Sequence, residues 1–195
     1  SPQVQRHRKF VSPSRFMEDF SAHPDGHSLA VTTRGKAFAF SNWEGSVLQI
    51  GETEGVRYRL TQWLNDKSFV TISDKGGKEA IEIHSTEFNG KVKRLDGIDI
   101  GRALDMEVSP TEEKIIISNH RSELILVDLA KKKLKVLDRS HYNRIQGFSW
   151  SPDGKWITYS CADTQNTISI KICNLKTGKI NRLTETRFRD INPSF

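Results

Sequence analysis

The chain has 195 residues, 35% of them hydrophobic and 28% charged, with a formal net charge of +6. This composition is typical of a globular protein and excludes an intrinsically disordered one. No apolar run approaches the ~18 residues of a transmembrane helix, and no apolar segment follows the basic residues 1–9 as it would in a signal peptide.

The positive charge alone is compatible with nucleic-acid binding. However, the 30 Lys and Arg residues are spread through the whole chain, and no RNP, KH, zinc-finger or helix-turn-helix motif accompanies them. We therefore expect neither a nucleic acid nor a membrane among the partners of this chain.

The two cysteines, Cys161 and Cys173, fall on neighbouring predicted strands. A hairpin centred near residues 163–165 places Cys161 opposite about Thr167, well away from Cys173. We therefore expect no disulfide but free buried thiols, which suit a reducing cytoplasm.

A strand–turn–strand pattern recurs along the chain. Residues 148–160 read as a strand, a tight turn at Pro152-Asp153-Gly154 and a second strand rich in aromatic and β-branched residues. A copy with the same Pro-Asp-Gly turn spans residues 20–31, and copies with other turn residues span 62–70 and 106–116. The turn residues 24, 65, 110 and 152 are separated by 41, 45 and 42 positions.

A period of this size, with four short strand candidates in each unit, is typical of β-propeller blades. We predict an all-β propeller with four complete four-stranded blades, at about residues 15–56, 57–101, 102–143 and 144–188. Residues 189–195 read as the start of another blade, and residues 1–14 as a lead-in or the outer strand of a preceding one. The chain is therefore expected to be an excerpt of a larger propeller.

The strand patterns favour stacked blades. Inner strands such as 115–117 and 124–127 are apolar on both faces, so both faces must be covered. The fourth strands are polar and lysine-rich, as at residues 131–136, which suits an exposed edge.

Residues 15–26 and 33–38, together with Gly55-Val56-Arg57-Tyr58-Arg59, resemble the second, seven-bladed propeller of the tricorn protease family. The turn at 150–155 resembles a wider group that includes TolB and the propellers of prolyl-oligopeptidase-like enzymes. Members of the tricorn family are large cytosolic serine peptidases that assemble as homohexamers and degrade oligopeptides released by the proteasome. Their catalytic residues lie in C-terminal domains.

The resemblance implies a non-catalytic propeller that shapes or gates a channel for peptide substrates and products. Its partners would be those peptides and the rest of its own peptidase chain. Two alternatives remain open: a TolB-like or WD40-like interaction scaffold, and the propeller cap of a prolyl-oligopeptidase-like enzyme.

The sequence predicts no catalytic residues, no metal site and no cofactor. No Gly-x-Ser-x-Gly nucleophile motif or Gly-rich phosphate loop is present. His23 and His27 are four positions apart, but Pro24 and Gly26 make a turn and not a helix there, so the spacing does not place them on one face.

One arginine recurs at a fixed distance from the turn. Arg57, Arg102 and Arg144 each lie eight positions before the turn residue of their unit (65 − 57, 110 − 102, 152 − 144), and Arg189 fits the same position in the incomplete unit. These positions fall in the loops that lead from one blade to the next and are expected to approach the axial channel. A ring of guanidinium groups there would attract carboxylates. The alternative is that each arginine pairs with an acid of the neighbouring blade and fastens the loop.

Overall fold

The computed structural model describes residues 12, 15–52, 54–87, 90–185, 187 and 189–195. These residues form four antiparallel sheets, each of four strands that follow one another in the sequence. The prediction of an all-β chain with four complete four-stranded blades is confirmed. The predicted lead-in, residues 1–14, lies outside the described residues except for Ser12.

The first two blades contain eight strands. The first consists of β1 (Met17–Ala22), β2 (Ser28–Thr33), β3 (Lys36–Ser41) and β4 (Leu48–Ile50). The second consists of β5 (Tyr58–Asn65), β6 (Ser68–Ser73), β7 (Ala80–Ser85) and β8 (Lys93–Leu95), with a short 3₁₀ turn, η3 (Lys75–Gly77), between β6 and β7.

The last two blades repeat this order. The third consists of β9 (Ala103–Val108), β10 (Lys114–Asn119), β11 (Glu123–Asp128) and β12 (Lys133–Arg139). The fourth consists of β13 (Gln146–Trp150), β14 (Trp156–Ala162), β15 (Ile168–Asn174) and β16 (Ile180–Arg182). In the described part of the chain, no helix is long and apolar enough to cross a membrane.

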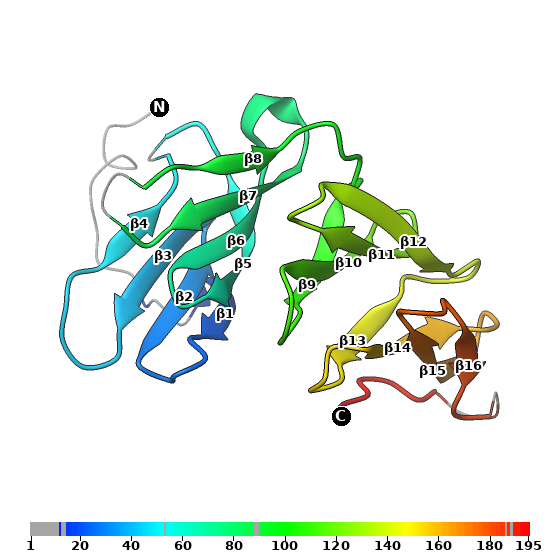
Figure 1. Cartoon of the computed structure of the whole chain (residues 1–195). Coiled ribbons are helices and arrows are strands. Elements are labelled where there is room, and N and C mark those ends of the chain that lie inside the picture. The colour runs from blue at the N-terminus through cyan, green and yellow to red at the C-terminus, as the bar shows by residue number, and fades with distance from the viewer. Residues whose placement is uncertain (1–11, 13–14, 53, 88–89, 186, 188) are drawn as a thin grey trace.

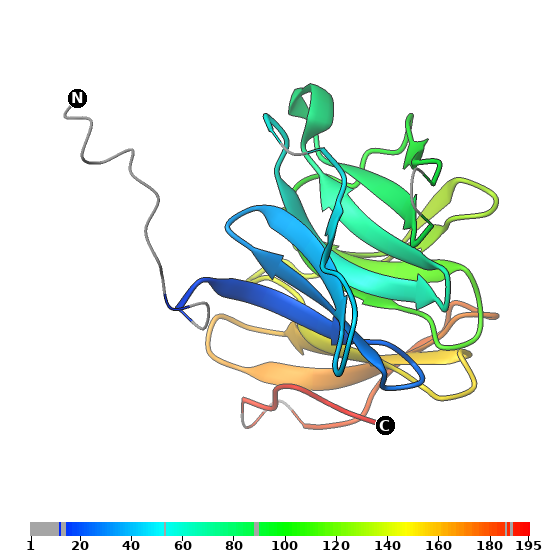
Figure 2. The same ribbon diagram turned by 90° about the vertical axis from the view of Figure 1, so that its left-hand side faces the viewer.

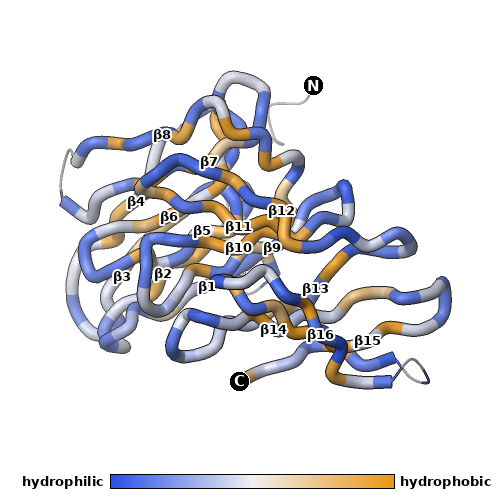
Figure 3. The backbone as a smooth tube through the Cα atoms, turned by 45° about the vertical axis from the view of Figure 1, so that its right-hand side comes forward, coloured by the Kyte–Doolittle hydropathy of each residue, from blue (hydrophilic) through white to orange (hydrophobic). Residues whose placement is uncertain are grey.

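The blades follow one another in an arc, with the first strands β1, β5, β9 and β13 in contact in succession on its inner side (Figures 1 and 2). A hydrophobic cluster fills each of the three joints between blades. Ile115, Ile116 and Ile117 are all fully buried because Ile116 packs toward the fourth blade and its two neighbours toward the second. Figure 3 shows this hydrophobic band around β10 and β11.

The Pro-Asp-Gly turn is needed for packing as well as for chain reversal. Gly154 has φ +67°, and its N–H donates to the carbonyl of Ser151 at 2.8 Å. A Cβ on Gly154 would lie 2.1 Å from Oγ1 of Thr111, in the corresponding turn of the third blade. Glycine therefore provides both the backbone angle and the close approach between adjacent blades.

The inner strands share a bulge. Each pairs with the second strand of its blade with a shift of register near the strand start. Leu60 and Gly147, each five positions before its turn residue (65 − 60, 152 − 147), have φ of +54° and +56° there. A bulge of this kind bends the strand and leaves backbone groups free to meet the adjacent blade.

Residues 189–195 lie against the fourth blade. Arg189 forms an isolated parallel bridge with Ile168, and the N–H of Asn192 donates to Oγ of Ser160 at 3.1 Å. The N–H of Thr61 in β5 makes the same kind of contact with the Thr32 hydroxyl of the first blade, at 3.3 Å. Residues 190–195 form no strand, so the start of a further blade at 189–195 stays a prediction.

Cys161 and Cys173 are both buried and free. The β14–β15 register sets Cys161 opposite Ser169, two residues beyond the predicted Thr167. The error follows from a longer hairpin loop than expected.

Candidate functional site

The recurring arginines lie at the junctions between blades. Arg57 immediately precedes β5, Arg102 immediately precedes β9, and Arg144 lies two residues before β13. Arg189 lies at the bridge to β15. All four residues are exposed, so their guanidinium groups are available to a ligand.

The structure brings two of them together. Arg57 and Arg102 line one cavity of about 190 Å³, between the second and third blades. Arg102 also lines a neighbouring cavity of about 670 Å³, whose lining carries charges of both signs, with Lys78, Arg94 and His120 beside Glu79, Asp96 and Asp99. The first two recurring arginines thus share a cavity at this blade junction, whereas Arg144 and Arg189 line neither cavity.

Acids lie near these arginines but make few close contacts with their guanidinium groups; Asp74, in the cavity of Arg57 and Arg102, accepts the Arg57 backbone N–H at 2.8 Å. Nη2 of Arg57 lies 3.9 Å from Glu18 of the first blade, and the Arg57 side chain is 55% exposed. Nε of Arg144 donates to Gln146 of its own blade at 3.2 Å. Among the described residues the Arg102 side chain has no hydrogen-bond or ion-pair partner. Its backbone is held by His120, whose Nδ1 accepts the Arg102 N–H at 2.9 Å and whose N–H donates to the Arg102 carbonyl at 3.0 Å.

Arg59 stabilises the junction between the second and third blades. Its Nη2 donates to Oε1 of Glu79 at 2.6 Å and to the carbonyl of Ala103 at 2.7 Å, while Oε2 of Glu79 accepts the Ala103 N–H at 2.7 Å. This half-buried ion pair ties the second blade to the first residue of β9. Sequence reasoning missed Arg59, because it lies two positions outside the recurring pattern.

Three acidic side chains on the inner strands β1 and β9, those of Asp19, Asp105 and Glu107, have a raised pKa. Burial raises the pKa of Asp19, and the charge of Asp105 adds to this effect. Burial also raises the pKa of Asp105, against opposing effects of the Met106 N–H and the Arg144 charge. Burial and the charge of Asp105 raise the pKa of Glu107 to about 7. The sequence contains one signal of this group, since Asp19 and Asp105 both lie five positions before a proline (24 − 19, 110 − 105).

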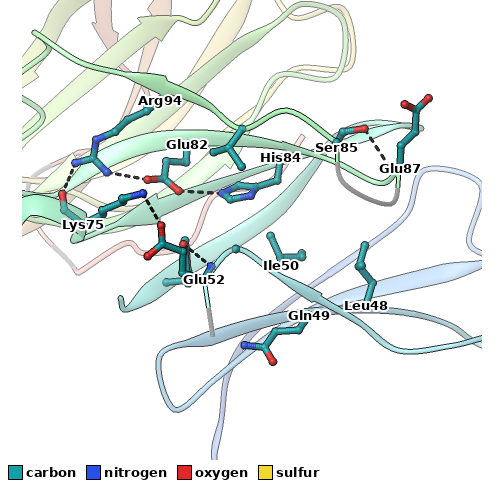
Figure 4. Close-up of a pocket in the computed structure, with 14 residues that line it drawn as sticks. Leu48, Gln49, Ile50, Glu52, Lys75, Glu82, His84, Ser85, Glu87 and Arg94 are labelled. Atoms are coloured by element: carbon teal, nitrogen blue, oxygen red, sulfur yellow. Dashed lines mark hydrogen bonds and ion pairs between the residues drawn. The ribbon is translucent and has the colours of Figure 1, made fainter. Parts of the chain in front are cut away.

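A third cavity, of about 500 Å³, opens on the rim between β4 and the strands β7 and β8 (Figure 4). Its floor is the buried carboxylate of Glu82, which contacts Nε2 of His84 at 3.0 Å and Nη1 of Arg94 at 2.7 Å. Burial opposes ionisation of Glu82, but hydrogen bonds from His84, Arg94 and Ser73 outweigh it, so that the pKa lies below its ordinary value. Arg94 also donates to the carbonyl of Lys75 at 2.6 Å. The network thus holds the η3 loop and β8 on the blade.

The structure brings His23 and His27 together, although their spacing in the sequence gave no reason to expect it. Their rings stack with centroids 4.0 Å apart and an angle of 28° between planes. The tight turn folds the chain back on itself, so that the residue before Pro24 and the residue after Gly26 meet side by side.

Comparisons with known proteins agree on one family. The family model described as the tricorn protease second beta propeller domain matches residues 17–195. A tricorn-like protease C-terminal subunit of Sulfurisphaera tokodaii is 35% identical over 86% of this chain and 19% of its own length. A tricorn protease homolog of Saccharolobus solfataricus is 30% identical over 96% of this chain and 17% of its own length. The chain thus spans less than a fifth of these relatives.

Comparison with solved structures also identifies propellers similar to this chain. The crystal structure of the tricorn protease superposes with a TM-score of 0.80 at 26% identity, over 92% of this chain and 18% of that chain. A TolB structure from Agrobacterium tumefaciens superposes with a TM-score of 0.69 at 18% identity, over 91% of this chain and 65% of that chain. The latter likeness shows the propeller fold alone.

Proposed function

Because this chain belongs to the tricorn protease second β-propeller family, we propose that it is a non-catalytic propeller of a tricorn-like serine peptidase and shapes peptide access. The parent protein would be a cytoplasmic homohexamer that degrades oligopeptides downstream of the proteasome. The partners of this segment would be peptide substrates or products and the remainder of its own chain.

The observation that carries the proposal is that two of the recurring arginines, Arg57 and Arg102, line one cavity. Two acids line the same cavity, but Glu79 is already paired with Arg59, and Asp74 accepts the backbone N–H of Arg57 at 2.8 Å. A guanidinium without a close acid retains its capacity for bidentate hydrogen bonds to a carboxylate. Every unmodified peptide ends in a carboxylate, so this surface would hold peptide C-termini near the axis of the arc. Arg144 and Arg189 would extend the surface along the remaining blade junctions.

Replacing both Arg57 and Arg102 by Gln in the full-length peptidase tests the role. We expect kcat/KM to fall roughly 5-fold for peptides with a free C-terminal carboxylate, because the attracting charge is lost. For peptides with an amidated C-terminus, kcat/KM should change by less than about 2-fold, since these peptides lack the carboxylate that the arginines recognise. Turnover of both substrate forms at low ionic strength is the measurement.

Lys176→Gln is the matched control, because Lys176 is an exposed cation in the β15–β16 turn, away from the arginine loops. It should leave both substrates unaffected. An equal loss on free and amidated peptides, or a lower Tm with unchanged turnover per folded molecule, would contradict the channel role and favour a purely structural one.

A further inference from the structure

The first Pro-Asp-Gly turn departs from the fourth at two positions. In the fourth blade, Ser151 precedes the proline, and its hydroxyl accepts the Trp156 N–H at 3.0 Å and donates to Asp153 at 2.6 Å. In the first blade the residue before the proline is His23, and His27 follows the glycine directly. The turn itself does not require imidazole at either position, because serine and lysine serve there in the fourth blade.

His23 is in an unusual environment for a polar side chain. It is only 3% exposed, stacks on His27, and meets the Trp63 ring edge-on with centroids 4.5 Å apart. Its Nδ1 accepts the Asp25 N–H at 3.1 Å, so the ring proton of the neutral imidazole resides on Nε2. That buried Nε2 has no hydrogen-bond partner. A buried donor without an acceptor costs about 1–3 kcal/mol, which calls for an explanation beyond the turn.

Carboxylates lie just beyond hydrogen-bond distance on both sides of this ring. Oδ2 of Asp25 is 3.9 Å from Nδ1, and Oδ1 of Asp66, in the β5–β6 turn of the second blade, is 3.9 Å from Nε2. The ligating atoms of His23, Asp25 and His27 all lie within 4.8 Å of one another.

We propose that His23, Asp25 and His27 bind a divalent transition-metal ion, with Zn²⁺ the best fit, and that Asp66 of the next blade supports the site. Two imidazoles and one carboxylate form a ligand set that Zn²⁺ accepts, with water in the fourth position. The ion replaces the Asp25 N–H at Nδ1 of His23. Nε2–H then donates to Asp66, in the carboxylate–histidine–metal arrangement that orients ligating imidazoles.

The ligands need only a small closing movement to reach this arrangement. Metal–ligand distances of about 2.0–2.2 Å place tetrahedral ligand atoms roughly 3.4 Å apart. His23 is fixed by burial, whereas Asp25 and His27 are exposed; Nδ1 of His27 contacts Oγ of Ser28 at 2.6 Å, which leaves Nε2 as the ring nitrogen available to the ion. Because Asp66 belongs to the second blade, a bound ion connects the turns of two blades and strengthens the joint between them.

Titration of the metal-free full-length protein with ZnCl₂ tests the site, with calorimetry and Tm as readouts. The unmodified protein should bind one more Zn²⁺ equivalent per chain than the His27→Gln variant. On addition of ZnCl₂, the Tm of the unmodified protein should rise by roughly 3 °C more than the Tm of that variant. Asp66→Asn should retain that equivalent but bind it about 10-fold more weakly. The control is His141→Gln, which removes an exposed histidine outside the turn and should leave binding unchanged.

Trp63 provides an independent signal at the site itself. A paramagnetic ion such as Co²⁺ bound beside His23 should quench the fluorescence of Trp63. The loss of tryptophan fluorescence on adding Co²⁺ should therefore be smaller in Trp63→Phe and in His27→Gln than in the unmodified protein. Equal Zn²⁺ stoichiometry in the unmodified protein and His27→Gln, or Co²⁺ quenching that is the same with and without Trp63, would overturn the proposal.

Discussion

Replacing Glu82 by Ala should lower the free energy of unfolding by about 3–5 kcal/mol, the usual cost of removing one partner from a buried ion pair. Glu82 is 2% exposed and contacts both Arg94 and His84. Its loss leaves the Arg94 guanidinium, whose side chain is 22% exposed, with only the exposed carboxylate of Asp96, 3.0 Å from Nε, as an acidic partner. The η3 loop that Arg94 holds should loosen as well. Urea unfolding at pH 7 measures the change.

Glu52→Ala is the matched control, because it removes a carboxylate at the mouth of the same cavity. Glu52 pairs with Lys75, but both side chains are 52% exposed. An exposed pair contributes below about 1 kcal/mol, so this variant should be nearly neutral. Equal costs for the two variants would contradict the assignment of the rim network to stability.

The pH dependence of this network has a definite sign. The pKa of Glu82 is lower in the folded protein than its ordinary value of 4.5. The unfolded chain therefore binds the proton more tightly, so the stabilisation is present above about pH 4.5 and is lost as the pH falls below it. Glu82→Gln should flatten that acid limb of the stability curve.

The repeat period and turn chemistry were sufficient to predict the blades, because each turn type is a local property of three or four residues. Strand ends were less predictable. Residues 46–50 read as an outer strand, but only Leu48–Ile50 pair in β4, since an outer edge has one neighbour and little burial to sustain it.

Side-chain encounters across the turn and between blades were beyond sequence reasoning. The stacking of His23 on His27 depends on the φ and ψ of the Pro-Asp-Gly turn, which a spacing rule for helices does not describe. The pairing of Arg59 with Glu79 depends on how the second and third blades meet. The recurring arginine was found because a repeat makes equivalent positions visible, whereas Arg59 occurs at its position without repetition.

Equivalence between blades also explains the environment of Glu107. Gln62 lies three positions before its turn residue (65 − 62), and its amide donates to the carbonyl of Met106 at 2.7 Å and accepts the Val108 N–H at 3.1 Å. It thus joins the inner strands of the second and third blades. Glu107 is the corresponding residue of the third blade (110 − 107), and its backbone carbonyl accepts the Nε1–H of Trp150, in the inner strand of the fourth blade, at 3.3 Å.

A carboxyl group can replace that amide only when it is protonated, because an ionised carboxylate has no donor for a backbone carbonyl. Oε2 of Glu107 is buried and has no hydrogen-bond partner. The charges around it are those of Asp105 on the same strand and of Arg144, which acts on Asp105. Burial and the Asp105 charge raise the pKa of Glu107 to about 7. Near neutral pH, Glu107 is therefore a mixture of the protonated form, which can replace the amide in the joint, and the ionised form, which cannot.

Glu107→Gln should therefore stabilise the protein above pH 7. Since the folded pKa of Glu107 is about 7 and its ordinary value is 4.5, the folded state binds the proton more tightly, and stability is lost as the pH rises from about 4.5 through 7. For a fully buried group, a pKa shift of this size corresponds to a loss of about 3 kcal/mol in the free energy of unfolding. Partial screening by solvent reduces the expected loss to about 2 kcal/mol. Urea unfolding should show this gain at pH 8.5 and almost none at pH 4.5.

The reciprocal variant Gln62→Glu should reproduce the defect at the joint between the second and third blades. It places an ionised carboxylate against the Met106 carbonyl that Gln62 now satisfies, so we expect a loss of about 2 kcal/mol at pH 8.5 that shrinks as the pH falls. If Glu107→Gln had the same effect at both pH values, or Gln62→Glu were neutral at pH 8.5, the two positions would not be equivalent. The two exchanges change the charge in opposite senses, so their opposite signs are expected, and it is the pH dependence at both positions that connects the effect to an ionised carboxyl group in the blade joint.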